Sequence, residues 1–394
     1  MFKRLLLMSA CLAATPCLAD PLLIGAWVGG FSGETYPQPT KANVDSFQRM
    51  QDRKLDIVSY FAMFDESWAK TRTYADIADR NGSILLVTWM ANGYNLDDIL
   101  NGDADEAIAN YASGVKSWGK EIWLRPFHEA NGDWYDWGIG KAGAGNTSAK
   151  CIAAWKHVVQ IFRDQSVPNV KWVWTTNATN SGAGTSLMGH YPGDDWVDYN
   201  SIDGYNWGES QSWSSWQSFQ EVFSPAYTAL AKRPKPIFIA EFSSTEHGGD
   251  KAAWIRDMFA ILPVEFPRIM GLMWFSQSKS AEADWAVNTT PAALEAWKQG
   301  IKAHPPTSGI EGTRPSRSTT EFGMVGGRLG FELERPGKVR MERLDPTGRR
   351  IESVSLWRLP AGANEIRMTS SSSPSIVLLE TEDGMRKGMI PPTP

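Results

Sequence analysis

The sequence is poor in cysteine and histidine, which excludes several kinds of site. It has 3 Cys in 394 residues, and Cys11 and Cys17 fall in an apolar N-terminal stretch that we expect to be cleaved. Because this leaves only Cys151, a disulfide framework and a cysteine-based metal site are ruled out. Cys151 lies in a helical pattern and is expected to be a small buried side chain. The 5 His show no metal-ligand spacing, so we expect no metal and no other cofactor.

The sequence also lacks a basic surface pattern and a membrane-spanning run. Its net charge is −5 and its 39 Lys and Arg are scattered, so nucleic acid is not expected as a partner. The apolar run at 5–18 is too short to span a membrane. Lys3 and Arg4 precede this run, and Ala19 ends it. Residues 1–19 are therefore predicted to be a signal peptide, which implies a secreted or periplasmic protein without stable membrane insertion.

Tryptophan, by contrast, is abundant. The chain has 19 Trp, although a large core can be built from Leu, Ile and Val. Some of these rings are expected to pack inside the protein, and others to offer flat apolar surfaces on which sugars stack. A polysaccharide is therefore the expected partner, and we expect the chain to be a monomer.

Residues 20–304 alternate short apolar runs with amphipathic stretches. The runs are continuously apolar, which is typical of parallel strands that are buried on both faces. Helical patterns lie between them, for example at 104–118, 147–164 and 251–262. Such an alternation of eight β units with helices predicts a catalytic domain with the α/β fold of a closed (β/α)8 TIM barrel. The eight runs are 23–29, 55–64, 83–90, 121–128, 170–177, 201–207, 236–242 and 269–275.

The composition changes after the predicted barrel. Residues 305–320 are rich in Pro, Ser, Thr, Gly and Arg, which predicts a linker. Residues 321–383 then contain short alternating runs separated by turn signals, and we expect a small C-terminal β-sandwich module there. Its one obvious aromatic is Trp357, which favours a spacer or stabilising role over sugar binding. Residues 384–394 are expected to be a tail. The runs are 328–334, 338–344, 351–359, 364–368 and 375–380.

Two glutamates stand where the catalytic groups of such a barrel are found. Reactive groups lie where the strands end and the βα loops begin. Glu129 follows the fourth predicted strand and Glu241 lies in the seventh, so the two should face each other across the barrel mouth. A lone Glu at a strand end is more commonly solvated. A facing pair suits glycoside hydrolysis, because one carboxyl protonates the leaving oxygen while the other meets the oxocarbenium-like carbon.

Several stretches of the sequence resemble glycoside hydrolase family 26. They are the motif at 125–134 (Arg-Pro-Phe-His-Glu-Ala-Asn-Gly-Asp-Trp), the strand at 239–244, and the segments at 172–177, 284–285 and 288–291. The resemblance extends over about 22–302. It implies a retaining hydrolase with Glu129 as acid/base and Glu241 as nucleophile. It also implies that the catalytic subsite is lined by Arg125, His128, Trp134, Tyr205 and Trp274. Trp89 and Asn177, at the ends of the third and fifth predicted strands, are expected to bind substrate as well.

The sequence alone leaves other roles open for several polar residues. Arg125 could equally be a structural cation inside the barrel, and His128 could be a core histidine rather than a group that orients substrate or tunes the acid. Asp65 and Glu66, after the second strand, are expected to be solvated. The same expectation applies to Asp133, Asp136, Asp203 and Glu209, as solvated or capping groups.

One position bears on the substrate. Members of the resembled family cleave mannans, mixed-linkage β-glucans or β-1,3-xylans, and its β-mannanases typically carry a His directly after the third-strand Trp. Here Met90 follows Trp89, and a thioether is a poor partner for a sugar hydroxyl. The segment at 96–102 is also more similar to the glucan-cleaving members. We therefore expect an endo-β-glycanase acting on β-1,4 linkages of a β-glucan or related exopolysaccharide. An endo-β-1,4-mannanase is the alternative, and a sugar-binding pseudoenzyme is the second.

Overall fold

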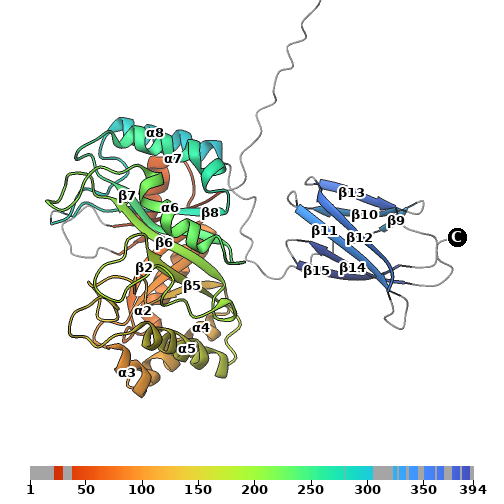
Figure 1. Ribbon diagram of the computed structural model, residues 1–394, viewed down its shortest axis with the longest axis horizontal. Helices are drawn as coiled ribbons and strands as arrows, with labels where there is room; N and C mark the ends of the chain where they lie inside the picture. The colour runs from red at the N-terminus through yellow and green to blue at the C-terminus, as the bar shows by residue number, and fades with distance from the viewer. Residues whose placement is uncertain are drawn as a thin grey trace, which may run out of the picture. The chain divides into compact units, whose positions relative to one another are not determined.

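The chain forms two compact units, Met1–Gly312 and Thr313–Pro394. The computed structural model describes residues 22–29, 38–279 and 281–304, together with the backbone of seven strands between residues 323 and 390 (Figure 1). The expected signal peptide and linker lie outside the described residues. Each unit is considered by itself below.

The first unit is built around a closed barrel of parallel strands. The strands follow one another around the barrel in the order β1 to β8, and β8 pairs with β1 to close it. This confirms the predicted (β/α)8 barrel. The predicted boundaries of all eight strands agree with the observed ones to within two residues. The strands are β1 (Leu23–Val28), β2 (Ile57–Met63), β3 (Ile84–Met90), β4 (Ile122–Pro126), β5 (Val170–Asn177), β6 (Tyr199–Asn206), β7 (Ile237–Ser244) and β8 (Ile269–Ser276).

Helices connect most successive strands of the barrel, whereas the connection from β5 to β6 holds only a short 3-10 helix. The first turns of several helices are fixed by side chains that accept backbone hydrogen bonds, as Thr147 does before α5 and Ser218 does before α6. The α6 cap is reciprocal, because Glu221 accepts a bond from the Ser218 backbone. The helices are α1 (Lys41–Gln51), α2 (Trp68–Asn81), α3 (Leu96–Asn101), α4 (Asp105–Trp118), α5 (Ser148–Asp164), α6 (Phe219–Leu230), α7 (Lys251–Glu265) and α8 (Pro291–Ala303), with a short 3-10 helix, η1 (Asp194–Trp196).

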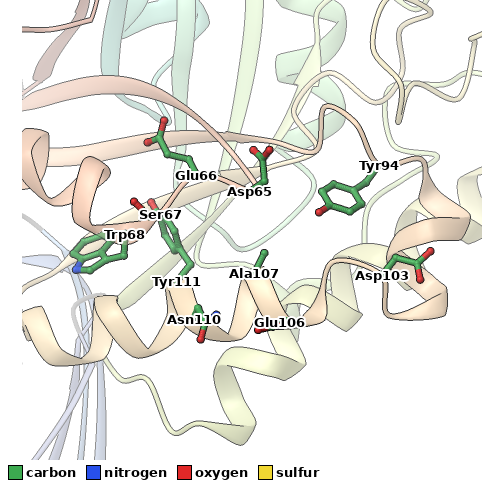
Figure 2. Close-up of a pocket in the computed structure, with 10 residues that line it drawn as sticks. All are labelled: Asp65, Glu66, Ser67, Trp68, Tyr94, Asp103, Glu106, Ala107, Asn110 and Tyr111. Atoms are coloured by element: carbon green, nitrogen blue, oxygen red, sulfur yellow. The ribbon is translucent and has the colours of Figure 1, made fainter.

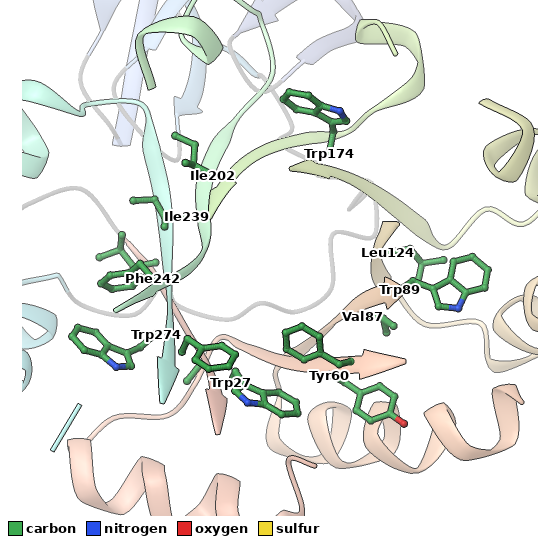
Figure 3. Packing of buried hydrophobic residues seen from close by; sticks show 14 of the residues in the cluster. Trp27, Tyr60, Val87, Trp89, Leu124, Trp174, Ile202, Ile239, Phe242 and Trp274 are labelled. Atoms are coloured by element: carbon green, nitrogen blue, oxygen red, sulfur yellow. The ribbon is translucent and has the colours of Figure 1, made fainter. Parts of the chain in front are cut away.

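Strand alternation sorts the apolar side chains into two buried clusters. One is small and includes Leu86, Trp123, Phe238 and Met273, from β3, β4, β7 and β8, and it fills the barrel interior. The other is large, and most of its side chains lie between the strands and the helices (Figure 3). Cys151 of α5 belongs to this outer cluster and is buried, as expected; burial raises the pKa of its thiol to about 12.

The second unit contains two antiparallel sheets. One has the order β13-β10-β9 and the other β12-β11-β14-β15. Residues 384–390 were expected to be part of a tail, but they pair with β14 as strand β15. That the two sheets pack face to face as a sandwich stays a prediction. The strands are β9 (Gly323–Val325), β10 (Arg328–Leu333), β11 (Gly337–Leu344), β12 (Arg350–Leu359), β13 (Gly362–Arg367), β14 (Ser375–Thr381) and β15 (Gly384–Ile390).

Candidate active site

A register shift in β7 turns Glu241 into the barrel. Phe238 and Ala240 both belong to the interior cluster, so strict alternation would place Glu241 on the outer face. The pairing with β6 shifts by one residue at this point, since Ile202 pairs with Ile239 and Asp203 with Glu241. Such bulges re-aim side chains at the rims of barrels. Here the bulge places the Glu241 carboxylate inside the mouth and leaves Phe242 facing the helices.

Both oxygens of Glu241 are held by donors. The Tyr205 hydroxyl donates to Oε2 at 2.7 Å, and the Arg125 guanidinium donates to Oε1. The Glu241 side chain is largely buried, and one of its two donors is a cation.

Glu129 stands in a tight turn directly after β4. Phe127 and Glu129 both have positive φ, 49° and 55°, a conformation that is uncommon for residues other than glycine. The turn presents the Glu129 carboxyl to two neutral donors. Nδ2 of Asn177 donates to Oε1 at 2.7 Å, and Nε1 of Trp134 donates to Oε2 at 2.8 Å.

The surroundings of Glu129 favour its protonated form. Burial raises its pKa, and the negative charge of Glu241 raises it further, to about 7. The bonds from Asn177 and Trp134 and the charge of Arg125 act in the opposite direction, but they do not cancel the rise. Two carboxyl groups in one pocket with separated protonation preferences are what an acid and a nucleophile require.

Arg125 connects Glu241 to polar side chains inside the barrel. Its guanidinium is fully buried and donates to Asp203 Oδ2 at 2.5 Å, to Thr88 Oγ1 at 2.6 and 3.1 Å, and to Glu241. Arg125 is therefore a structural cation inside the barrel. It also contacts Glu241, the expected nucleophile, and so belongs to the site as well. Asp203 is fully buried as the counter-ion of Arg125, so the expectation that it is solvated was wrong.

His128 packs against aromatic side chains of the loop that follows β4. It is fully buried, its Nε2 pairs with the Tyr135 hydroxyl at 2.9 Å, and its ring meets Trp137 at 5.6 Å. Burial, and then the charge of Arg125, lower its pKa well below the usual value, so the imidazole is neutral. Its contacts stabilise the loop that carries Trp134.

One residue was not singled out by the sequence and has a clear positioning role. Asn131 is fully buried, and its side chain accepts from the Asn177 backbone N–H at 2.8 Å and donates to the Asn177 carbonyl at 2.9 Å. It thus fixes the end of β5 against the loop after β4. The amide that donates to Glu129 is held in place by this link.

The comparisons with known proteins identify the family of this chain. The sequence profile of glycosyl hydrolase family 26 matches residues 56–246, which include both glutamates. The chain belongs to glycosyl hydrolase family 26. It is 47% identical over 329 residues to Endoglucanase H of Acetivibrio thermocellus, a match that covers 80% of this chain and 35% of that protein. The chain therefore spans about a third of that relative's length.

More distant family 26 relatives carry other names. A mannan endo-1,4-beta-mannosidase of Bacillus subtilis is 30% identical over 157 residues, which are 38% of each chain. The solved structure of a Cellulomonas fimi endo-beta-1,4-mannanase double mutant aligns with a TM-score of 0.55 at 15% identity, over 94% of this chain and 93% of that one. At this identity the likeness shows the fold alone.

Two tryptophans expected at the family 26 substrate site lie elsewhere. Trp89 points out of the barrel, where its ring stacks on Tyr111 of α4 at 4.6 Å. Trp274 also points outward and packs on Phe242 and Trp297 at 4.9 and 5.1 Å (Figure 3). Both expectations were wrong, because the residue one position further along each strand faces inward.

The neighbours of these tryptophans that face inward are Phe275 and Met90, and both line the inside of the barrel. In β8 the interior residue is Phe275, whose ring lies 5.9 Å from Tyr205 and 6.3 Å from Trp27. In β3 it is Met90, which has the same orientation as Thr88, the partner of Arg125. Met90 is buried. Met90, on which the expected substrate depends, therefore lies on the inner face of the barrel.

A separate cavity of about 390 Å³ opens between the loop after β2 and α4 (Figure 2). Asp65 on its wall is exposed, as expected. Glu66 is not solvated as expected, because its carboxylate accepts from Tyr60 at 2.6 Å and Thr71 at 3.0 Å and pairs with Lys70 at 2.6 Å. Asp133 and Glu209 are exposed, and Asp136 pairs with Lys141.

Within the described residues, no group of three or more His, Cys, Asp or Glu side chains is arranged to hold a metal ion. No helix in this part of the chain is both long and apolar enough to cross a membrane.

Proposed function

We propose that this chain is a retaining endo-β-glycanase that cleaves β-1,4 linkages by double displacement. The observation that carries the proposal is the unequal pair in the barrel mouth. Glu241 is held by a cation and a phenol, whereas Glu129 has neutral donors and a pKa raised to about 7. This asymmetry supports the proposal that Glu241 is the nucleophile and Glu129 the acid/base.

The reaction follows from these positions. A Glu241 oxygen attacks the anomeric carbon while Glu129 gives its proton to the departing glycosidic oxygen, and the C–O bond of the linkage breaks. Glu129, now ionised, takes a proton from water. The resulting hydroxide oxygen attacks the anomeric carbon and releases Glu241. One water is consumed and both carboxyl groups return to their starting states.

We propose a β-glucan or related exopolysaccharide as the substrate. Two observations support it. Met90 brings an apolar side chain where a hydroxyl-binding group would stand in the β-mannanases that the sequence resembles, and the relative with 47% identity is named an endoglucanase. Mannan is the second candidate, favoured by the relatives named mannan endo-1,4-beta-mannosidase. Secretion by the expected signal peptide at 1–19 is part of the same proposal.

The test is a panel of mixed-linkage β-glucan, unsubstituted β-mannan, glucomannan and β-1,3-xylan, digested by the full chain and by two variants. Glu129→Gln and Glu241→Gln should each lower the rate by at least roughly 10²-fold, because each removes one proton-transfer or nucleophilic group. Circular dichroism should show both variants folded. A folded wild type that binds these glycans but cleaves none would instead support the pseudoenzyme reading.

A further inference from the structure

Trp213 is an exposed aromatic residue on the catalytic face of the barrel. It is 69% exposed, although large apolar side chains are normally withdrawn from water. It lies in the connection between β6 (Tyr199–Asn206) and α6 (Phe219–Leu230), which places it at the same end of the barrel as Glu129 and Glu241. The proposed chemistry does not use it.

The loop that carries Trp213 is firmly attached to its neighbours. Nε2 of Gln211 donates to the Glu282 carbonyl at 2.8 Å, in the connection after β8. The Ser214 hydroxyl donates to the Gly208 carbonyl at 2.7 Å within the loop. Gly208 has a φ of 51°, and a Cβ there would lie 2.0 Å from the His247 carbonyl oxygen, so the backbones after β6 and β7 are in close approach. The exposed ring is therefore held in a defined position.

Aromatic rings connect Trp213 with the nucleophile. The centroid of Trp213 lies 5.1 Å from that of Trp207, and Trp207 meets Trp285 edge-on at 4.8 Å. Trp285 in turn lies 5.0 Å from Tyr205, whose hydroxyl donates to Glu241. The chain of contacts runs from the reacting group to the exposed ring without interruption.

We propose that Trp213 is a stacking platform for one sugar unit of the β-glycan, in a subsite beyond the one that holds the cleaved bond. This inference rests on the proposed function and deepens it. A pyranose with equatorial substituents presents C–H faces that match one flat indole ring, and an exposed ring of this size is far too small for a stable protein interface. Trp207 supports the platform from behind.

The test uses chain-length dependence. The ratio of kcat/KM on the longest to that on the shortest cleaved oligosaccharide of the accepted glycan is measured for the full chain and its variants. Trp213→Ala should lower this ratio by about five- to tenfold, as expected for loss of one aromatic contact. Trp213→Phe should recover most of it, because it keeps a flat ring.

The matched control is Val264→Ala. Val264 is 72% exposed but lies near the end of α7 (Lys251–Glu265), on the side where β8 begins, away from the mouth. It should leave the length ratio unchanged. A ratio that is the same in Trp213→Ala as in wild type, or a Trp213→Phe variant no better than Trp213→Ala, overturns the platform but not the proposed function.

A binding measurement separates the two proposals. Glu241→Gln and the Glu241→Gln/Trp213→Ala double variant are titrated calorimetrically with the longest soluble gluco- and manno-oligosaccharides. The double variant should bind about five- to tenfold more weakly. If wild type cleaves nothing in the panel, the proposed function fails, and this affinity difference alone decides whether Trp213 binds sugar. Equal affinities overturn the platform.

Discussion

Tyr205 donates its phenolic hydrogen bond to Oε2 of Glu241 at 2.7 Å. The other oxygen of that carboxylate accepts a hydrogen bond from Arg125, so one donor to Glu241 is a cation and the other is a phenol. Glu129 receives only neutral hydrogen bonds, from Asn177 and Trp134. The two glutamates therefore have different donors, and burial together with the charge of Glu241 raises the pKa of Glu129 although its own donors lower it.

Tyr205→Phe tests the first of these contacts. The ring can keep its packing on Trp285, whose centroid lies 5.0 Å away, while the hydroxyl is lost. A hydrogen bond to a charged group contributes about 1.5–3 kcal/mol, so kcat should fall of the order of 10- to 100-fold. Steady-state kinetics measures this, with a thermal melt to show that the fold is kept. An unchanged kcat would mean that the hydroxyl does not support the nucleophile.

Trp134→Phe should shift the pH dependence upward. Glu129 must be protonated to act as an acid, so kcat/KM should fall as the pH rises through about 7. The Trp134 bond favours the ionised form, and its removal raises the pKa of Glu129 further. The basic limb of the kcat/KM profile should therefore move to higher pH. Asn177→Ala removes the second donor and should move it the same way; a downward shift in either variant would contradict the assignment.

Arg125→Met should destabilise the barrel strongly. It leaves the carboxylates of Asp203 and Glu241 buried without their cation, and breaking a buried pair in this way costs about 3–5 kcal/mol. Adding Asp203→Asn removes one of the unpaired charges, so the double variant should be more stable than Arg125→Met. Urea unfolding measures both. A loss below about 1 kcal/mol in Arg125→Met would show that the pair is not a structural anchor.

Met90→His should move specificity toward mannan. Wild type is expected to have a higher kcat/KM on mixed-linkage β-glucan than on unsubstituted β-mannan, because Met90 offers no hydrogen bond to a sugar hydroxyl. A histidine on this inner face restores a polar partner and should lower the glucan-to-mannan ratio. Met90→Leu keeps the surface apolar and should leave the ratio near that of wild type. A wild type that cuts mannan efficiently and leaves β-glucan intact would contradict the Met90 argument.

The barrel and its two glutamates could be predicted from the sequence because apolar runs and their spacing are local signals. Whether a side chain at a strand end points into or out of the barrel is not a local signal of this kind. Trp89 was expected at the site because it ends a strand, and Trp274 because of the family resemblance. Leu86 and Met273, however, lie inside the barrel, so alternation turns both tryptophans outward. Counting alternate residues from these apolar positions would have indicated Met90 and Phe275 instead.

Other features depend on contacts between distant segments. The β7 register shift that turns Glu241 inward exists only relative to β6, so the sequence of β7 alone does not reveal it. Asp203 and Glu66 were expected to be solvated because acidic residues usually are. Asp203 is buried against Arg125, which is 78 positions earlier in the chain. Such a partner is identified by the fold and not by local composition.

The most direct test of the central claim is the stereochemistry of the first product. Proton NMR is recorded during the opening minutes of digestion of the accepted β-glycan, before the new reducing end equilibrates between its anomers. With Glu241 as nucleophile and Glu129 as acid/base, two inversions at the anomeric carbon should release the β anomer first. Initial release of the α anomer would mean a single displacement by water and would contradict the account of both glutamates.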